Sequence, residues 1–357
     1  MAHDWLLVET LGREPVVVAE GNRTLNLVPV SEFLRRNPHA MTIHTAIGET
    51  IRAGQGLSSI TPKNDRVIRT EMVQMIDGTI HGVHVWDGPP DVEPPERPIP
   101  GPLVWDLTNG VATDTTESLA NSGRDPSVET THGRVFAEDL PTRDLSEREA
   151  HVLSAAIEPE PGRVYCSSWD LTDHLGNPIV VGFVARIMAE GDGGPDHVIC
   201  RAMNWRSVRD DATLSPDDVG RSVLDDPQTP GVHRALVDLK SWTLLKWLDE
   251  PCPFYDWRHR DEDEPMVHPD DADEVAAMTA DFGTRDFGSQ SASRVLRLHA
   301  TGGGWTPVHV TVNRVQLGDG VYAGMLSLRE PTDAERKDSE GRPASRLRLL
   351  RNKIVRT

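Results

Sequence analysis

The residues best suited to chemistry form an acidic, histidine-containing run in the last third of the chain. Imidazole nitrogens and carboxylate oxygens bind divalent cations, so this run could hold a metal ion, as in a metal-dependent hydrolase. Its spacing is loose for a metal site, and a solvated acidic loop ahead of a helix explains the same residues. The hydrolase is therefore kept as an alternative. The residues concerned are Asp256, His259, Asp261, Glu262, Asp263, Glu264 and His268.

The last residues of the sequence are basic and patterned like an amphipathic helix. Leu347, Leu350 and Ile354 would share one face of a helix that starts near Pro343. In an acidic chain, such a helix could contact a protein partner or an anionic membrane surface. Docking on the protein's own acidic surface, or a frayed tail, would give the same pattern. The candidate binding residues are Arg346, Arg348, Arg351, Lys353 and Arg356.

The remaining reactive groups form no recognisable catalytic motif. Cys166, Cys200 and Cys252 are widely spaced and odd in number, so they predict neither a disulfide framework nor a metal site. Cys166 and Cys200 fall in neighbouring strand candidates, where they would fill core space. The sequence also has no Walker-type loop and no Gly-x-Ser-x-Gly elbow. We therefore expect no enzymatic activity and no bound cofactor.

Composition limits the class of protein. A chain of 357 residues is too long for one ordinary core, so we expect two or three domains. The formal net charge of −19 argues against general binding to nucleic acid, which needs a basic footprint. No stretch approaches the roughly 20 apolar residues that cross a bilayer, and the first residues do not resemble a signal peptide. These features predict a cytoplasmic protein.

The elements that would position such groups begin with a unit near the N-terminus. Val67–Ile76 and Ile80–Trp86 flank Asp77-Gly78, which is a strong signal for a β-hairpin. An isoleucine recurs every four residues from Ile43 to Ile51, which predicts a helix with one apolar face. This unit should therefore combine an antiparallel sheet with helices.

A proline-rich segment, Gly88–Pro102, follows the first unit. Prolines fix φ and remove hydrogen-bond donors, so the segment cannot join the interior of a sheet and should act as a semi-rigid spacer. The middle unit then contains a strand, a helix with a capping-box pattern at Ser146 and a meander of three strands. The strand candidates are Leu103–Leu107, Arg163–Trp169, Ile179–Met188 and His197–Trp205.

A long helix is predicted over Val232–Leu248, between the middle and the last unit. Val232, Leu236 and Leu239 recur at i, i+4 and i+7, and Trp242 widens the apolar face. Prolines bracket the segment on both sides. We expect this helix to pack on both units and to relay a signal between them, with these four residues as the relay candidates.

The last unit has the clearest strand pattern of the sequence. Ser293–His299, Trp305–Val315 and Val321–Leu328 are predicted as three consecutive strands, with glycine-rich turns between them. Valines alternate with polar residues from Val308 to Val312, so one face of that strand should lie against a core. The unit ends as an antiparallel meander.

In its order of elements the last unit resembles a PAS domain. Phe254-Tyr255-Asp256-Trp257 is followed by Val267-His268-Pro269-Asp270-Asp271, which is similar to a helix-opening segment of that family, and then by the meander. The first unit is similar in order, and the middle unit resembles a GAF domain, a related sheet-and-helix fold. The opening His3–Gly12 resembles the start of an actinobacterial family with tandem PAS–GAF–PAS domains. The resemblance implies a signalling or regulatory protein without an attached catalytic domain.

The resemblance also draws attention to histidines of the first unit. In PAS and GAF sensors a helix histidine can ligate haem, and His44 lies beside the apolar stripe of its helix; a hydrogen-bonded histidine without haem is the alternative. His81 and His84 lie three residues apart on one strand, which places them on opposite faces unless a bulge intervenes. Neither pattern leads us to predict a cofactor.

Together these patterns predict an α+β fold of three small domains, each an antiparallel sheet with helices. We expect a non-enzymatic sensory or regulatory protein that binds a small apolar ligand or a protein partner and signals through protein–protein interaction. A scaffold docked at a membrane surface through the basic helix is one alternative, and the metal-dependent hydrolase is another. The predicted boundaries are 1–88 (PAS-like), 89–102 (proline-rich linker), 103–226 (GAF-like), 227–251 (linker helix), 252–330 (PAS-like) and 331–357 (basic tail).

Overall fold

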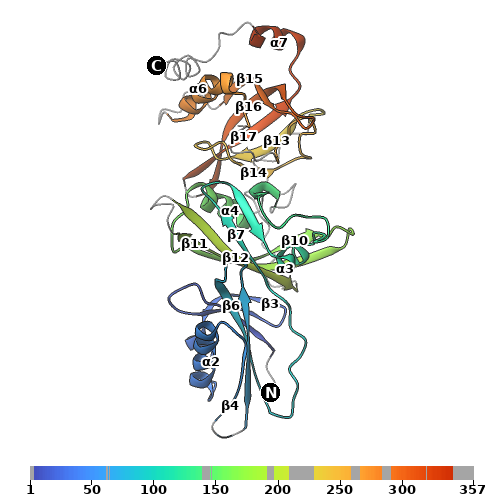
Figure 1. The fold of residues 1–357 in the computed structure, drawn as a ribbon. Helices are drawn as coiled ribbons and strands as arrows, with labels where there is room; N and C mark the ends of the chain where they lie inside the picture. The colour runs from blue at the N-terminus through green and yellow to red at the C-terminus, as the bar shows by residue number, and fades with distance from the viewer. Residues whose placement is uncertain are drawn as a thin grey trace, which may run out of the picture. The chain divides into compact units, whose positions relative to one another are not determined.

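The structure is a computed structural model that describes residues 4–61, 63, 65–138, 145, 147–190, 197–208, 229–258, 266–283, 291–318 and 320–340. Over these residues the chain forms three antiparallel sheets with a few helices, which confirms the predicted α+β class (Figure 1). Contacts divide the chain into two compact units. The first contains Met1–Arg134 and Pro159–Ser215, and the second contains Val135–Glu158 and Pro216–Thr357.

The N-terminal sheet has six strands in the order β3-β2-β1-β6-β5-β4. Helix α2 covers one face of this sheet, where it packs on β4, β5 and β6 (Figure 1). The strands are β1 Leu6–Glu9, β2 Val16–Glu20, β3 Arg23–Pro29, β4 Leu57–Ile60, β5 Val67–Gln74 and β6 Ile80–Gly88. Two helices, α1 Val30–Phe33 and α2 Ala40–Ala53, lie between β3 and β4 in the chain.

The predicted hairpin and helix of this domain are confirmed. Gly78 adopts a φ of 88°, which a glycine tolerates in a tight turn, and Asp77 Oδ1 accepts a hydrogen bond from Thr79 N. Ile43 and Ile47 of α2 are buried against the sheet. The sequence analysis does not predict β3 and β4, and none of their side chains is fully buried.

The middle sheet also has six strands, in the order β10-β11-β12-β7-β8-β9. It contains all four strands that the sequence predicts for this region. The short helix α3, Thr116–Asn121, follows β8, and Thr115 Oγ1 caps it by accepting a hydrogen bond from Ser118 N. The strands are β7 Gly101–Asp106, β8 Val111–Asp114, β9 Arg134–Val135, β10 Val164–Thr172, β11 Pro178–Ala189 and β12 Val198–Ser207.

Within the first unit the N-terminal and middle sheets pack against each other. Leu7 and Val18 of the N-terminal sheet share a buried cluster with Met203 and Trp205 of the middle sheet. Strand β6 is therefore covered on both faces, by α2 on one side and by the middle sheet on the other, and its residues are buried along almost the whole strand. A movement of β6 would change its packing against both α2 and the middle sheet, because protein cores are close-packed.

The third sheet has five strands in the order β14-β13-β17-β16-β15. His268 opens the helical segment as the sequence predicts, and its Nδ1 accepts a hydrogen bond from Asp270 N. The strands are β13 His233–Val237, β14 Leu244–Trp247, β15 Ser291–His299, β16 Trp305–Gly318 and β17 Val321–Arg329. The helices are the 3-10 turn η4 Pro269–Asp271, α6 Ala272–Gly283 and α7 Asp333–Glu340.

The predicted relay helix is wrong, because Val232–Leu248 forms the antiparallel hairpin β13–β14. Of the four relay candidates, Val232 precedes β13 and Leu236 lies within it. Leu239 and Trp242 lie in the turn and pack against the core of the third sheet. The segment is therefore part of the last domain, and the linker helix predicted over 227–251 is not present in the residues described there, 229–251.

Turn chemistry explains why a hairpin replaces the helix. Asp238 Oδ1 accepts a hydrogen bond from Lys240 N, and Asp238 Oδ2 accepts one from Ser241 N, so the aspartate closes a turn with its own side chain. Trp242 has a φ of 58°, a left-handed conformation that a helix interior does not allow. Short apolar runs fit both periods, and here the turn decides between them.

All three sheets share one strand order. In each sheet the first strand pairs with the last, β1 with β6, β7 with β12 and β13 with β17. The second strand pairs with the outer side of the first, and the remaining strands of the meander continue on the other side. Helices separate the opening strands from the meander in every case. The chain therefore repeats one topology three times, although the third sheet, over the described residues, has no counterpart of the outermost strands β3 and β9.

Helix α4, Glu147–Ile157, differs in placement from the prediction. The sequence assigns it to the middle domain, but it packs on β16 and β17 and belongs to the second unit. Glu149 of α4 forms a buried ion pair with Lys246 of β14, with 3.0 Å between Oε1 and Nζ. The chain thus passes from the first unit into the second at residue 135 and returns to the first after residue 158.

The proline-rich segment after β6 is packed rather than a free spacer. As predicted, residues 89–100 contain no strand. The prediction is wrong at the ends of the segment, because Gly88 belongs to β6 and Gly101 and Pro102 belong to β7, an inner strand of the middle sheet. Trp5 Nε1 donates a hydrogen bond to Pro95 O at 2.8 Å, and the Arg97 guanidinium lies 5.8 Å from the Trp5 ring centre. The segment is therefore attached to the N-terminal sheet.

Candidate functional site

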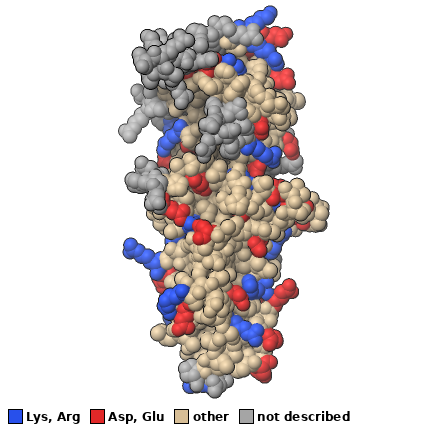
Figure 2. Space-filling model, viewed as in Figure 1, with Lys and Arg blue, Asp and Glu red and all other residues tan. Residues whose placement is uncertain are grey.

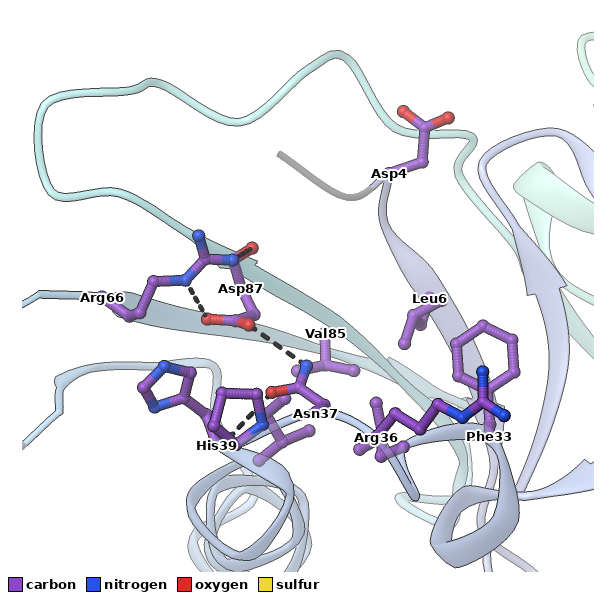
Figure 3. Close-up of a pocket in the computed structure, with 12 residues that line it drawn as sticks. Asp4, Leu6, Phe33, Arg36, Asn37, His39, Arg66, Val85 and Asp87 are labelled. Carbon is purple, nitrogen blue, oxygen red and sulfur yellow. Dashed lines mark hydrogen bonds and ion pairs between the residues drawn. The ribbon is translucent and has the colours of Figure 1, made fainter. Parts of the chain in front are cut away.

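A cavity of about 380 Å³ lies in the N-terminal domain, between the sheet and the helical segment. Its lining comes from β1, β6, the residue before β5 and the chain from α1 into α2 (Figure 3). The volume falls within the range of small-molecule sites in proteins, which starts at roughly 300 Å³. This is the candidate site that the geometry favours.

The floor of the cavity is apolar. Leu6 of β1 and Val85 of β6 come from the sheet, while Leu34 and Ile43 come from the helical side, and all four side chains are buried. Half-buried Phe33 completes this surface. The same isoleucine stripe that predicts helix α2 thus contributes to the cavity. A ligand that buries its apolar parts against such a floor removes apolar surface from water, which favours binding.

One wall of the cavity is an ion pair. Arg66 Nε donates to Asp87 Oδ1 at 2.9 Å, and Arg66 Nη2 donates to the Asp87 main-chain oxygen at 2.7 Å. Asn37 Nδ2 approaches Asp87 Oδ2 at 3.4 Å, so the three side chains form a row along the wall (Figure 3). Only 8% of the Asp87 side chain is exposed, and its charge is therefore compensated by Arg66 rather than by water.

The segment between α1 and α2 forms the edge of the cavity. Asn37 Oδ1 accepts a hydrogen bond from His39 N at 2.8 Å, and Asn37 N donates to Leu34 O. Pro38 restricts the backbone between them, so this turn is held by its own sequence. The turn places Arg36 and His39 at the cavity, and Arg36 is exposed at its rim.

The cavity combines apolar and polar lining. Its described lining contains charged and amide side chains and an imidazole beside the apolar floor. An apolar floor beside a charged wall can hold and orient a small amphiphilic molecule.

Family models match nearly the whole chain. The N-terminal domain of the Rv3651-like family matches residues 4–96, the middle domain matches residues 99–207 and the C-terminal domain matches residues 217–339. The chain belongs to the Rv3651-like family. No curated protein matches the chain.

The crystal structure of a Mycobacterium tuberculosis protein has the same fold as this chain. It is that of an uncharacterised protein with 55% sequence identity and a TM-score of 0.85, over 94% of this chain and 99% of that one. The Escherichia coli DhaR(N)–DhaL complex and an RNA-binding light-oxygen-voltage receptor are each 10% identical, with TM-scores of 0.21 and 0.23. They cover 58% and 67% of this chain and 80% and 97% of theirs. Scores this low support no inference.

Of the residues predicted for a metal site, the structure describes only Asp256 and His268. Residues 259–265 lie outside the described part of the chain, and with them His259 and four of the carboxylates. His268 caps η4, and its ring packs edge-on against Trp305 with 5.0 Å between ring centres. Asp256 Oδ2 lies 3.8 Å from His299 Nδ1. Among the described residues, no group of three or more metal-binding side chains is found.

The first part of the predicted basic tail, residues 331–340, is described and contains helix α7. Arg346, Arg348, Arg351, Lys353 and Arg356 all lie beyond residue 340, outside the described residues. On the face drawn in Figure 2, acidic and basic side chains are interspersed. No helix in the described residues is both long and apolar enough to cross a membrane.

The two strand histidines lie on the same side of the N-terminal sheet, so the prediction of opposite faces is wrong. A register shift in the β5–β6 pairing opposite His81 makes that residue an extra, bulged one. His81 Nδ1 lies 2.7 Å from Ala202 O of the middle sheet. His84 pairs with Leu7, whose side chain lies in the core between the two sheets. His44, the haem candidate, is half-buried on α2 and does not line the cavity.

Sequence reasoning misses most of the cavity residues, although one signal for them exists. The Asn37-Pro38 pair between two helical segments is a strong turn signal, and it marks the edge of the cavity. Arg66 and Asp87 are far apart in sequence, and the pattern of each strand gives no indication that they form a pair. Their pairing follows from the hydrogen-bonded register of β5 and β6.

Proposed function

We propose that this Rv3651-like protein is a non-enzymatic sensory regulator that binds a small molecule in the N-terminal cavity and signals through contact with another protein. The observation that carries the proposal is the cavity itself, with its buried apolar floor and its compensated Arg66–Asp87 wall. A protein that only filled this space with side chains would serve as a scaffold instead.

The order of elements supports a sensory domain. Opening strands, helices and a final meander recur in the three domains, and this is the order on which the resemblance to PAS and GAF domains rests. In such folds the sheet and its crossing helices enclose an apolar pocket. The cavity lies in the corresponding place of the N-terminal domain, between α2 and the sheet.

Strand β6 offers a route for the signal within the first unit. It supplies Val85 and Asp87 to the cavity. A Cβ on Gly82 of the same strand would come within 2.8 Å of the Met203 side chain of the middle sheet. A ligand that prefers one packing of β6 would shift the population of both sheets toward that packing, by as much as its affinities for the two packings differ. A second protein would detect this change by binding one packing more tightly than the other.

Native mass spectrometry and a thermal-shift screen test the proposal. We expect a small molecule to be retained or to raise Tm, because a ligand at 100 times its Kd stabilises the folded state by about 2.7 kcal/mol. Ile43→Phe should fill the cavity and abolish the effect. Ile51→Phe, at a partly buried position on the same helix but outside the cavity, is the matched control. If no compound stabilises the protein and the two variants respond alike, the protein acts as a scaffold.

A further inference from the structure

The unused hydrogen-bonding groups of the cavity point to the chemistry of its ligand. The acceptors of the wall are already engaged: both carboxylate oxygens of Asp87 receive donors, and Asn37 Oδ1 receives the amide of His39. A ligand that offered only donors would therefore compete with Arg66 for the same oxygens.

The unused groups at the cavity are mainly donors. Among the described residues, Arg66 Nη1 makes no hydrogen bond, and the exposed Arg36 guanidinium makes no hydrogen bond or ion pair. A guanidinium forms its strongest hydrogen bonds with carboxylate or phosphate oxygens. Two arginines at one cavity thus favour an anionic group.

Helix α2 adds a weaker preference of the same sign. The helix begins beside the cavity, at His39, which makes no side-chain cap, and its first turn contains no acidic residue. The first amide groups of a helix lack partners within the helix and carry partial positive charge. They therefore support the two guanidinium groups without forming a site alone.

Asp4 is the one competing charge at the rim. Its side chain is exposed, so water and salt screen it, and Figure 3 shows its carboxylate pointing away from the row formed by Arg66, Asp87 and Asn37. The carboxylate of Asp87 is neutralised by Arg66. Neither acid therefore offsets the donors inside the cavity.

On the basis of the proposed function, we infer that the ligand is a small amphiphilic carboxylate. Its carboxylate accepts hydrogen bonds from Arg36 at the rim, and its apolar body covers Leu6, Ile43 and Val85 on the floor. A phosphate would also accept hydrogen bonds from arginine, but a phosphate without an apolar body would leave the apolar floor exposed to water. The combination selects an organic acid with a short hydrocarbon or aromatic part.

Three molecules of equal length and different head groups test the inference. Octanoate, octan-1-ol and octylamine are titrated into the full chain by isothermal titration calorimetry. We expect octanoate to bind at least about tenfold more tightly than the alcohol, because charge-assisted hydrogen bonds are the stronger ones. Arg36→Gln should weaken octanoate about tenfold and leave the alcohol unchanged, since only the anion uses the guanidinium.

Two variants serve as controls. Arg35→Gln removes the neighbouring exposed arginine, which does not line the cavity, and should leave octanoate binding unchanged. Ile43→Phe should weaken both octanoate and the alcohol. Equal or tighter binding of the alcohol or the amine overturns the inference and leaves the ligand site in place. If none of the three binds, the inference is also overturned, and the wider screen decides the proposed function separately.

Discussion

Two buried histidines give the first unit a dependence on pH. Burial lowers the pKa of His81 from 6.5 to about 4, and the nearby Arg201 adds to this effect, while Ala202 O, Asp77 and Glu190 oppose it. Burial, followed by the charge of Arg97, lowers the pKa of His84 from 6.5 to about 3. Both imidazoles are therefore neutral in the folded protein at neutral pH.

We expect the folded state to lose stability as the pH falls below 6.5. The unfolded chain binds a proton at each histidine near that pH, whereas the folded chain does so only near pH 4 at His81 and near pH 3 at His84. The contribution of the two neutral histidines to the unfolding free energy is complete above pH 6.5. It is lost as the pH falls from 6.5 toward the pKa values of the folded state. Each histidine should contribute roughly 3 kcal/mol or more to this loss. Urea unfolding between pH 7 and pH 4 measures it.

Variants isolate the histidines from the carboxylates that titrate in the same range. His84→Gln should flatten the pH dependence of the unfolding free energy. His132→Gln replaces an exposed histidine and should leave that dependence unchanged. Parallel curves for all three proteins would contradict the assignment to His84.

The cysteines are predicted to resist alkylation. Burial raises the pKa of Cys166 and Cys200 to about 12 and that of Cys252 to about 11, from an ordinary value of 9. A shift of three pKa units lowers the reactive thiolate fraction about a thousandfold. Mass spectrometry after iodoacetamide treatment at pH 8 should find little labelling of native protein and complete labelling in urea. Rapid labelling of native Cys200 would reveal opening of the middle sheet.

At the scale of elements, helix α4 depends on a buried ion pair. Lys246 is fully buried on β14, and its Nζ lies 3.0 Å from Glu149 Oε1. Lys246→Met leaves the glutamate charge without its lysine partner and should destabilise the protein by about 3–5 kcal/mol. Replacing Glu149 by leucine in the same chain should recover most of that loss. Urea denaturation provides the comparison.

A surface pair serves as the control for this prediction. Lys240 and Glu158 are both exposed, with 3.6 Å between Nζ and Oε1. Lys240→Met should change the unfolding free energy by less than about 1 kcal/mol, because exposed ion pairs contribute little. A similar effect of Lys240→Met and Lys246→Met would show that burial is not what makes the inner pair matter.

The elements also show where sequence patterns are sufficient and where they fail. The meander of the third sheet follows from its alternating valines and its glycine turns, and α2 follows from its isoleucine stripe. Val232–Leu248 fails because the helical spacing of Val232, Leu236 and Leu239 is also compatible with two short strands around an aspartate turn. The cavity could be predicted only in part, since Arg66 and Asp87 meet through strand register and not through any local motif.

At the scale of the whole molecule, the three family segments do not coincide with the two compact units. The match to the C-terminal domain covers residues 217–339, but α4, which packs on its sheet, comes from within residues 99–207. The capping-box pattern locates α4 in the sequence without indicating which sheet it covers. Tertiary contacts, which the local pattern does not encode, decide that question.

Fragment complementation tests this arrangement. We expect residues 217–339 alone to be unstable, because the surface beneath α4 is uncovered. Adding a peptide of residues 135–158 should raise the Tm of the fragment, and the rise should increase with the logarithm of the peptide concentration above its Kd, since a ligand of the folded state stabilises it by mass action. A peptide with Leu153→Asp, which changes a fully buried position, should have no effect. Equal melting with either peptide would contradict the placement of α4.

The placement of residues 135–158 in the second unit also affects how the chain folds during its synthesis. About 150 residues separate the end of α4 from β16, so at roughly 5–20 residues per second the ribosome takes about 7 to 30 seconds to deliver the surface on which α4 packs. During that interval a newly made helix with a buried-type face, including Leu153 and Ile157, has no partner. The nascent chain is therefore most vulnerable to aggregation, and most dependent on chaperones, after its middle sheet is synthesised and before its last hairpin emerges.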